Sequence, residues 1–379
     1  MRLTTAGESH GRALVAIIEG LPAHLKLDIE KINEQLALRQ SGFGRGARQK
    51  IEKDRVEILT GVRNCETLGS PVTLCIFNRD FSNWENCMSA DVCDETKMKE
   101  KSLTKVRPGH ADLTGVIKFD QADARNVLER ASARETAIRV AAGGVYRQYL
   151  SALGVEIGGY VKEVCGVKDE GRYSFSDLAR AKTTGVGMLD EEAEKRAEEK
   201  IAQLKKDGDT CGGVVEIRVK GLKSGFGNVM TYAEKLDAKL ARGLMSIQAI
   251  KGVEIGMGFE VGEKSGKDVH DEIFYDETRG FYRETNRAGG IEGGMSNGEE
   301  IVLRVAMKPI PTLMNGLKTV DYLTKQPTTA ASERSDVCAI FALEVIAEAV
   351  VAEVLAGVVA QRIGGDTISE AQTRYNALP

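Results

Sequence analysis

The amino-acid sequence predicts an α+β fold in which antiparallel sheets lie outside buried central helices. Segments 215–219 and 301–305 place apolar residues at every second position, as in strands that have one buried face and one solvent-exposed face. Sheets with one solvent-exposed face are typically antiparallel. Segment 335–363, in contrast, is apolar on nearly all sides, which is typical of a helix buried within the protein.

Three further segments have helical patterns. Residues 28–39 alternate apolar and charged side chains at helical spacing, and Asp28 is a suitable N-cap. Residues 131–153 are rich in alanine and include small residues that suit close packing of helices. Residues 190–206 carry apolar side chains three and four positions apart and reach Gly208, which predicts a surface helix that ends there.

Composition limits the class of protein. The chain has 379 residues, of which 42% are hydrophobic and 28% charged, as in soluble globular proteins. Its 52 basic and 56 acidic residues give a net charge of −4, so there is no basic field to hold nucleic acid. The length allows one large domain or two ordinary ones. No linker divides the chain cleanly, and the polar segment 83–105 is interpreted as a surface excursion.

The N-terminal residues and the cysteines indicate the compartment. Residues 1–11 lack the basic and apolar regions of a secretory signal. The seven cysteines are scattered without C-x-x-C spacing, which favours reduced thiols over a disulfide framework or a zinc site. The most apolar segment, 337–363, is interrupted by four charged residues and is therefore not typical of a membrane span. We expect a cytoplasmic protein that binds neither membranes nor metal ions.

Two of the four histidines stand in glycine-rich surroundings. His10 lies in Gly-Glu-Ser-His-Gly, and His110 lies in Arg-Pro-Gly-His-Ala-Asp. Small neighbours leave an imidazole open to a substrate, and imidazole exchanges protons near neutral pH. One such residue could simply be a turn histidine that bonds to the backbone, but two of them beside Ser, Arg or Asp favour a function. His24 and His270 are interpreted as surface residues.

A cluster of basic residues indicates an anion site. Segment 37–51 contains no acidic residue, yet it holds Arg39, Arg45, Arg48 and Lys50 among several glycines. Glycines let backbone N–H groups approach an anion, and guanidinium groups bind carboxylate or phosphate through two hydrogen bonds. We favour an anion site here over a solvated basic loop. The spacing of small residues at 42, 44 and 47 imitates a dinucleotide fingerprint, but no strand precedes it.

Further residues extend this pattern along the chain. Arg130 and Arg134 are four positions apart, which predicts that they share one helix face near its positive N-terminal end. The glycine-rich segment 288–298 and the turn at 308–312 offer backbone for close approach. Asp336 is interpreted as a possible N-cap of the apolar helix. Together these features predict a site for highly anionic small ligands with two histidines for proton transfer, but they do not identify the reaction.

Short motifs in a fixed order resemble those of the chorismate synthase family, and they extend over nearly the whole chain. The resemblance implies a single domain over residues 1–379. The motifs lie at residues 7–11, 39–42, 44–46, 107–112, 133–137, 252–256, 289–294 and 334–336.

The resemblance implies a phosphate lyase that eliminates phosphate from 5-enolpyruvylshikimate 3-phosphate to give chorismate, in the shikimate pathway to aromatic amino acids. Reduced FMN is required although the reaction has no net redox change, and NADPH is the expected indirect reductant. The implied fold is a β-α-β sandwich with central helices between antiparallel sheets, assembled as a homotetramer. The substrate carries two carboxylates and a phosphate, and FMN brings another phosphate, which fits the many arginines.

Matching motifs also imply roles for individual residues. His10 resembles the acid that protonates the departing phosphate, and His110 resembles the residue beside the flavin pyrimidine ring. Asp336 resembles the aspartate that helps to remove the C6 proton. Residues that match the substrate or NADPH side are Arg39, Arg45, Arg48, Arg107 and Arg134. Residues that match the FMN side are Arg130, Ala131, Ser132, Gln248, Ala249, Gly293, Lys308, Pro309, Ile310, Pro311, Thr312 and Arg334.

Two other functions remain compatible with the residues alone. A flavin-binding or anion-binding protein without catalytic activity would use the arginines and glycines but would not need His10 and His110. An enzyme with its own flavin reductase activity would oxidise NADPH unaided. Because no segment of the chain suggests a reductase module, we expect the monofunctional type, which depends on an external flavin reductase or another electron donor.

Overall fold

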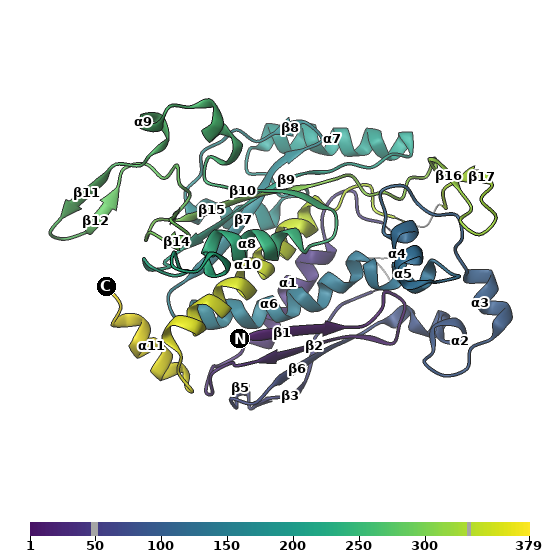
Figure 1. Ribbon diagram of the computed structural model, residues 1–379, viewed down its shortest axis with the longest axis horizontal. Helices are drawn as coiled ribbons and strands as arrows, with labels where there is room; N and C mark the ends of the chain where they lie inside the picture. The colour runs from purple at the N-terminus through teal and green to yellow at the C-terminus, as the bar shows by residue number, and fades with distance from the viewer. Residues whose placement is uncertain (47–51, 332–334) are drawn as a thin grey trace.

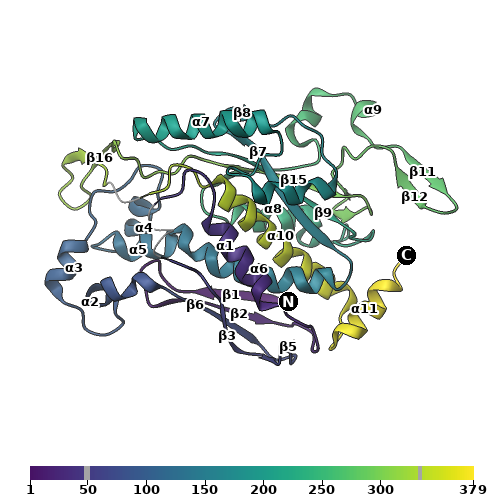
Figure 2. The ribbon, with the colours of Figure 1, turned by 180° about the vertical axis from the view of Figure 1, so that it is seen from behind.

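Two antiparallel sheets enclose a layer of helices in the computed structural model, which describes residues 1–46, 52–331 and 335–379 (Figures 1 and 2). One sheet has the order β1-β2-β6-β3. Its strands are β1 (Arg2–Ala6), β2 (Ala13–Glu19), β6 (Val72–Phe77) and β3 (Glu57–Thr60). The other sheet has the order β10-β15-β9-β7-β8. Its strands are β10 (Ile250–Ile255), β15 (Ile301–Met307), β9 (Gly213–Lys220), β7 (Glu156–Val164) and β8 (Val167–Lys168).

The helical layer consists of α1 (Ile29–Gln40), α6 (Thr136–Ser151) and α10 (Ile340–Ile363). Helices α6 and α10 approach closely where Gly143 faces Ala349, because a Cβ atom at Gly143 would lie only 2.3 Å from that of Ala349. The inner side chains of both sheets and of these helices form one apolar core. The predicted α+β fold, with central helices between antiparallel sheets, is thereby confirmed.

The remaining elements surround this sandwich. A pair of hairpins and several short helices lie at its two ends (Figure 1). The other helices are α2 (Glu85–Met88), α3 (Glu95–Lys101), α4 (Asp112–Phe119), α5 (Arg125–Ala131), α7 (Glu191–Asp207), α8 (Leu236–Met245), α9 (Gly266–Val269) and α11 (Ile368–Asn376). The 3-10 helices are η2 (Arg79–Asn83), η3 (Ala133–Glu135), η4 (Phe175–Thr183), η5 (Tyr232–Glu234) and η6 (Gly258–Glu263). The short strands are β4 (Val62–Arg63), β5 (Glu66–Thr67), β11 (Ile273–Asp276), β12 (Gly280–Arg283), β13 (Ile291–Glu292), β14 (Met295–Ser296), β16 (Lys318–Val320) and β17 (Pro327–Thr329).

For two helices, the ends predicted from local signals in the sequence agree closely with the structure. Helix α1 begins after Asp28, whose side chain accepts hydrogen bonds from the N–H groups of Glu30 and Lys31. Helix α7 lies on the outside of the molecule and ends at Gly208, which adopts a left-handed conformation. Both predictions are confirmed, because periodicity and caps are local properties of the chain.

Two boundaries were predicted wrongly. The alanine-rich segment is interrupted at Ser132, which is extended and whose side chain accepts a hydrogen bond from the N–H of Arg134, so α6 begins only at Thr136. Arg130 and Arg134 therefore do not share a helix face. The apolar helix α10 begins at Ile340 after Ala339, so Asp336 is not its N-cap.

Two further expectations concern membrane-spanning helices and the two remaining histidines. Across the parts of the chain that it describes, no helix combines the length and the apolar character that crossing a bilayer would require. His24 and His270 are exposed, as the sequence predicted.

Candidate active site

Most of the predicted site residues meet in one cavity of about 560 Å³. It lies where the first turns of α10 face the junction between α5 and α6 and the loops that follow β15 and precede α4. The predicted residues that line it are His10, Arg39, Arg45, Arg107, His110, Ala131, Ser132, Arg134, Gln248, Ala249, Lys308, Ile310, Pro311, Thr312 and Asp336.

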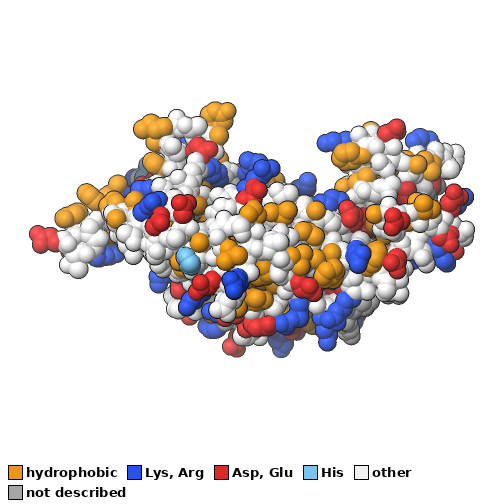
Figure 3. Space-filling view, turned by 90° about the horizontal axis from the view of Figure 1, so that it is seen from below, with side chains coloured by type: hydrophobic (Ala, Val, Ile, Leu, Met, Phe, Trp, Pro, Cys, Tyr) orange, Lys and Arg blue, Asp and Glu red, His pale blue; other side chains and the backbone are white. Residues whose placement is uncertain are grey.

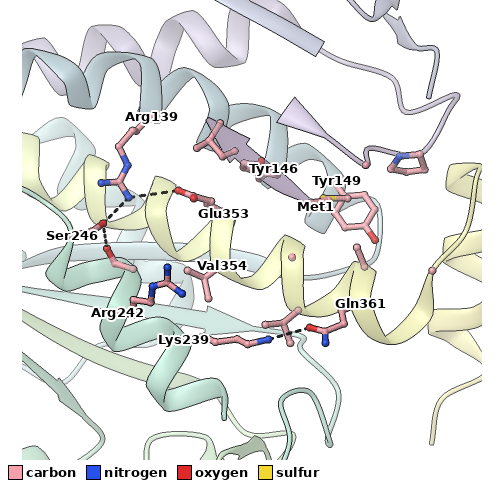
Figure 4. Close-up of a pocket in the computed structure, with 18 of the residues that line it drawn as sticks. Met1, Arg139, Tyr146, Tyr149, Lys239, Arg242, Ser246, Glu353, Val354 and Gln361 are labelled. Atoms are coloured by element: carbon pink, nitrogen blue, oxygen red, sulfur yellow. Dashed lines mark hydrogen bonds and ion pairs between the residues drawn. The ribbon is translucent and has the colours of Figure 1, made fainter. Parts of the chain in front are cut away.

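A second cavity, of about 760 Å³, is less suited to the predicted chemistry. Figure 4 shows it between α6, α8 and α10, with the N-terminal Met1 at its edge. Arg139 bonds there to Ser246 at 3.1 Å and lies 3.6 Å from Glu353. Its lining contains no histidine and none of the residues assigned a role in substrate or cofactor binding. The smaller cavity is therefore the candidate active site.

His10 is held by a buried carboxylate. Its Nδ1 atom lies 2.9 and 3.0 Å from the two carboxylate oxygens of Glu129, and its backbone N–H donates to the same carboxylate at 2.7 Å. Burial alone would raise the pKa of Glu129, but the hydrogen bonds from His10 and the nearby charge of Arg125 hold that pKa below its usual value. Glu129 therefore stays ionised, and Nε2 is the ring nitrogen of His10 that remains for a substrate.

His110 has a similar arrangement. Its Nδ1 atom lies 2.5 Å from Oδ1 of Asp112 and 3.1 Å from Nη2 of Arg107. Arg107 also donates through Nε to Oδ2 of Asp112 at 2.8 Å. Asp112 is fully buried, which would raise its pKa, yet the hydrogen bonds from His110 and Arg107 hold that pKa well below its usual range. This turn thus fixes the orientation of both a histidine and an arginine.

The remaining arginines of the cavity are buried beside carboxylates and polar groups. Arg39 donates to Thr136 and to the carbonyl of Ala133, and its burial lowers its pKa to about 9. Arg134 binds Asp54 at 2.6 Å and the side-chain oxygen of Asn78. Arg45 lies 2.9 Å from Asp336, but its buried Nε has no hydrogen-bond partner among the described residues. These cations favour an anionic ligand.

Asp336 is anchored to the segment that carries Arg45. Its Oδ1 atom accepts a hydrogen bond from the N–H of Gly46 at 2.6 Å, and its Oδ2 atom faces Arg45. Only glycine allows this approach without adjustment, because a Cβ at position 46 would lie 3.1 Å from Oδ1 of Asp336. The carboxylate is therefore fixed at the edge of the cavity.

The expected FMN side has features that fit a polar ligand. The side-chain oxygen of Gln248 is buried without a hydrogen-bond partner among the described residues. Lys308 bonds to the carbonyl of Gly109, and its pKa is lowered by burial and by the nearby Lys251. An unsatisfied buried acceptor and a partly buried cation are groups that a flavin phosphate and its polar ring edge could satisfy.

Some predicted residues lie elsewhere. Arg130 is 43% exposed in its side chain and bonds to Thr5 and to the carbonyl of Gly7, outside the cavity lining. Gly293 and Pro309 are also absent from that lining. Arg48 and Arg334 lie outside the described residues.

Sequence reasoning missed several residues that support the site. Glu129, Asp54 and Glu52 balance its charges, and none of them was singled out. The one local signal was the spacing of Arg125 and Glu129, which are four apart on α5 and lie 3.1 Å from each other. The pairing of Glu129 with His10 joins residues 119 positions apart, so no local pattern could predict it.

Comparisons with known proteins show similarity over nearly the whole chain. The model of the chorismate synthase family matches residues 1–360. A chorismate synthase of Caldicellulosiruptor bescii is 52% identical over 371 residues, which cover 97% of this chain and 96% of that protein. One from Geobacter metallireducens is 52% identical over 385 residues, with 99% and 98% covered. A crystal structure of a chorismate synthase is similar with a TM-score of 0.79 and 37% identity, covering 99% of this chain and 96% of that one.

Proposed function

The chain belongs to the chorismate synthase family, and we propose that its reaction takes place in the cavity that contains His10, His110 and Asp336. It is a lyase that eliminates phosphate from 5-enolpyruvylshikimate 3-phosphate to give chorismate. One observation supports the location above all. Two histidines share this cavity with four arginines whose side chains are at most 10% exposed, which are Arg39, Arg45, Arg107 and Arg134.

The arginines bind and orient the substrate. Its two carboxylates and its phosphate need several cationic donors, and guanidinium groups bind such anions through paired hydrogen bonds. Arg45 offers the unpartnered Nε atom, and Arg107 is held in place by Asp112. A ligand fixed in this way enters the reaction already oriented, which lowers the barrier through proximity.

His10 protonates the departing phosphate through Nε2, because Nδ1 is engaged by Glu129. Asp336 helps to remove the C6 proton from a position fixed by Gly46 and Arg45. His110 lies on the FMN side and is oriented by Asp112. Buried charges around a reacting anion act more strongly than in water, so the cavity favours the developing phosphate charge.

The family uses reduced FMN, and the residues that would hold it here are Ala131, Ser132, Gln248, Ala249, Lys308, Ile310, Pro311 and Thr312. When bound, reduced FMN supplies electron density to the substrate ring and so helps phosphate to leave. The unsatisfied oxygen of Gln248 and the cation of Lys308 support this placement.

The decisive test measures phosphate and chorismate release by purified protein supplied with substrate and chemically reduced FMN. Replacing His10 or His110 with alanine should lower turnover by about 10²–10⁴-fold, which is the usual contribution of general acid–base catalysis. Circular dichroism should show that both variants stay folded. Full turnover by either variant near neutral pH would refute the role given to that histidine.

The electron source is a second part of the proposal. We infer that a separate flavin reductase or another donor supplies the reduced FMN, with NADPH as the indirect reductant. Oxidised FMN and NADPH alone should then give almost no chorismate, while added dithionite should restore turnover. Rapid turnover without an external reductant would show that the chain reduces flavin itself.

The chain is also proposed to be one domain that assembles as a homotetramer. Apolar side chains on the projecting hairpin β11–β12 support an assembly, because Ile273, Tyr275 and Phe281 are 60–77% exposed. Figure 3 shows apolar side chains on this arm, at the left of the view. Exposed apolar patches typically mark interaction sites. Light scattering should give four times the 41.1 kDa chain mass, and a monomer at micromolar concentration would refute the assembly.

A further inference from the structure

The polar segment 83–105, for which the sequence suggested no role, places an aromatic ring on His10. Trp84 is the one tryptophan in the sequence. It lies between η2 and α2, and the centroid of its ring is 4.0 Å from that of the imidazole, with 32° between the planes. The indole therefore lies over one face of the proposed proton donor.

Trp84 is itself held in place by polar and charged neighbours. Its Nε1 donates to Asp80 at 3.1 Å. Arg125 lies over the indole at 5.0 Å from the ring centroid, and Lys101 at 4.7 Å. Arg125 also bonds to the carboxylate of Glu129 at 3.1 Å and to the carbonyl of Lys101. Arg125 thus contacts both the indole that covers His10 and the carboxylate of Glu129 that binds His10.

The two contacts restrain the imidazole in different ways. Glu129 binds the ring edge at Nδ1, which fixes the tautomer that keeps its hydrogen there. The indole covers a ring face, which limits rotation of the imidazole, and its π electrons attract a cationic ring. The side chain of His10 is only 14% exposed as a result of this packing.

We propose that Glu129 and Trp84 are positioning residues for His10, which hold its Nε2 toward the cavity in the orientation and tautomer that deliver a proton. This inference rests on the proposed function, in which His10 protonates the departing phosphate. Neither residue touches the substrate in this scheme. Their loss should therefore lower kcat far more than it changes KM.

The first experiment compares Glu129→Gln with wild type and with His10→Ala. Glutamine keeps the shape but removes the charge and can stabilise the wrong tautomer, so kcat should fall at least about 10-fold, within the range of acid–base catalysis. In the His10→Ala background the same change should add less than about 2-fold, because the two residues act as a unit. Glu66→Gln is the matched control, since Glu66 lies 3.6 Å from the exposed His24, and it should leave kcat unchanged.

The outcomes separate the two levels of the proposal. If His10→Ala is slow while Glu129→Gln turns over like wild type, Glu129 does not position His10. An equally large loss from Glu129→Gln in both backgrounds would also overturn its action through His10. If His10→Ala itself keeps full turnover, the role proposed for His10 fails first.

Trp84 provides an independent test that leaves the Glu129–Arg125 pair intact. Trp84→Phe retains a ring over the imidazole and should keep kcat within about 3-fold of wild type, whereas Trp84→Ala should lower it about 10-fold with little change in KM. Equal rates for the alanine and phenylalanine variants would refute the role of Trp84.

Nitrogen NMR of histidine-labelled protein gives a readout that does not depend on turnover. The ring signals of His10 should indicate a hydrogen on Nδ1 in the wild type, and a mixture of tautomers in Glu129→Gln. The signals of His24 serve as the internal reference in both proteins. An unchanged tautomer in the variant would overturn the positioning by Glu129 even if that variant were slow.

Discussion

The most informative change outside the active site removes the cation between two buried acids of the central helix. Glu344 and Glu348 lie one turn apart on α10 and are 1% and 0% exposed in their side chains. Lys182 from η4 contacts both carboxylates, and Arg147 from α6 contacts that of Glu348. Replacing Lys182 with methionine keeps the apolar stem of the side chain but leaves two carboxylates with one cation.

The size of the effect follows from the burial of the pair. Removing one partner of a buried ion pair typically costs about 3–5 kcal/mol of unfolding free energy. Two features limit the cost here. Arg147 still compensates Glu348, and burial together with the neighbouring Glu348 raises the pKa of Glu344 to about 8, so that Glu344 can remain protonated near neutral pH. We therefore expect a loss of about 3 kcal/mol for Lys182→Met, at the lower end of that range.

The pH dependence has a definite sign. Because the pKa of Glu344 is raised on folding, its contribution to stability is complete below its usual pKa and is lost as the pH rises toward 8. Lys182 is the cation that opposes this rise in pKa, so the destabilisation caused by its loss should be smaller at pH 5 than at pH 9. Glu348 behaves in the opposite way. Burial would raise its pKa, but Lys182 and Arg147 lower it to about 2, so its contribution is present above its usual pKa and is lost as the pH falls toward 2.

The assay is guanidinium-induced unfolding of wild type and Lys182→Met at pH 5, 7 and 9, followed by far-UV circular dichroism. Lys200→Met provides a control on α7, where the residue is exposed. A loss below 1 kcal/mol at every pH would refute the reasoning about the buried pair. A loss that shrinks from pH 5 to pH 9 would refute the direction assigned to Glu344.

Three further predictions concern the cavity and the helical layer. Arg45→Ala should lower kcat/KM roughly 10- to 100-fold, because a charge-assisted hydrogen bond contributes about 1.5–3 kcal/mol, and Arg45→Lys should recover only part of it. Equal values for all three proteins would show that Arg45 does not bind the substrate. Gly143→Ala should destabilise the fold by about 1–3 kcal/mol in the same unfolding assay, because overpacking against Ala349 exceeds the gain of about 1 kcal/mol in helix propensity. A variant more stable than wild type would contradict the close contact between the two helices. Reduced FMN should bind more tightly when substrate is present, because we expect the two ligands to stack in one cavity and each to complete the other's pocket. Equal affinities in anaerobic titrations with and without substrate would contradict this stacking.

The sequence predicted those parts of the fold that local patterns determine. Helix α7 was located through its periodicity and its terminal Gly208. The break at Ser132 was missed because alanine-rich sequence favours a continuous helix, whereas the serine side chain caps a new turn at Arg134. Asp336 was assigned to a cap on position alone, but its carboxylate is taken by the N–H of Gly46 from a distant part of the chain.

The same limit applies to the candidate site. His10 and His110 could be singled out because their glycine neighbours are adjacent in sequence. The carboxylate that contacts His110 is also close in sequence, since Asp112 lies two positions away. Glu129 and Trp84 reach His10 only through the packing of α5 and of the segment before α2, which no spacing in the sequence encodes.

The position of the site follows from where α10 begins. This 24-residue helix starts behind Ala339 without a side-chain cap among the described residues, and its first turns line the cavity. The partial positive charge of that end adds to the guanidinium groups of Arg39 and Arg45. Burial lowers the pKa of Arg39 to about 9, so the folded protein holds these cations at a cost in solvation. A bound anion removes that cost through the same hydrogen bonds that orient it. The proton donor depends instead on Glu129 of α5, so anion binding at the start of α10 and proton delivery rely on different helices around one cavity.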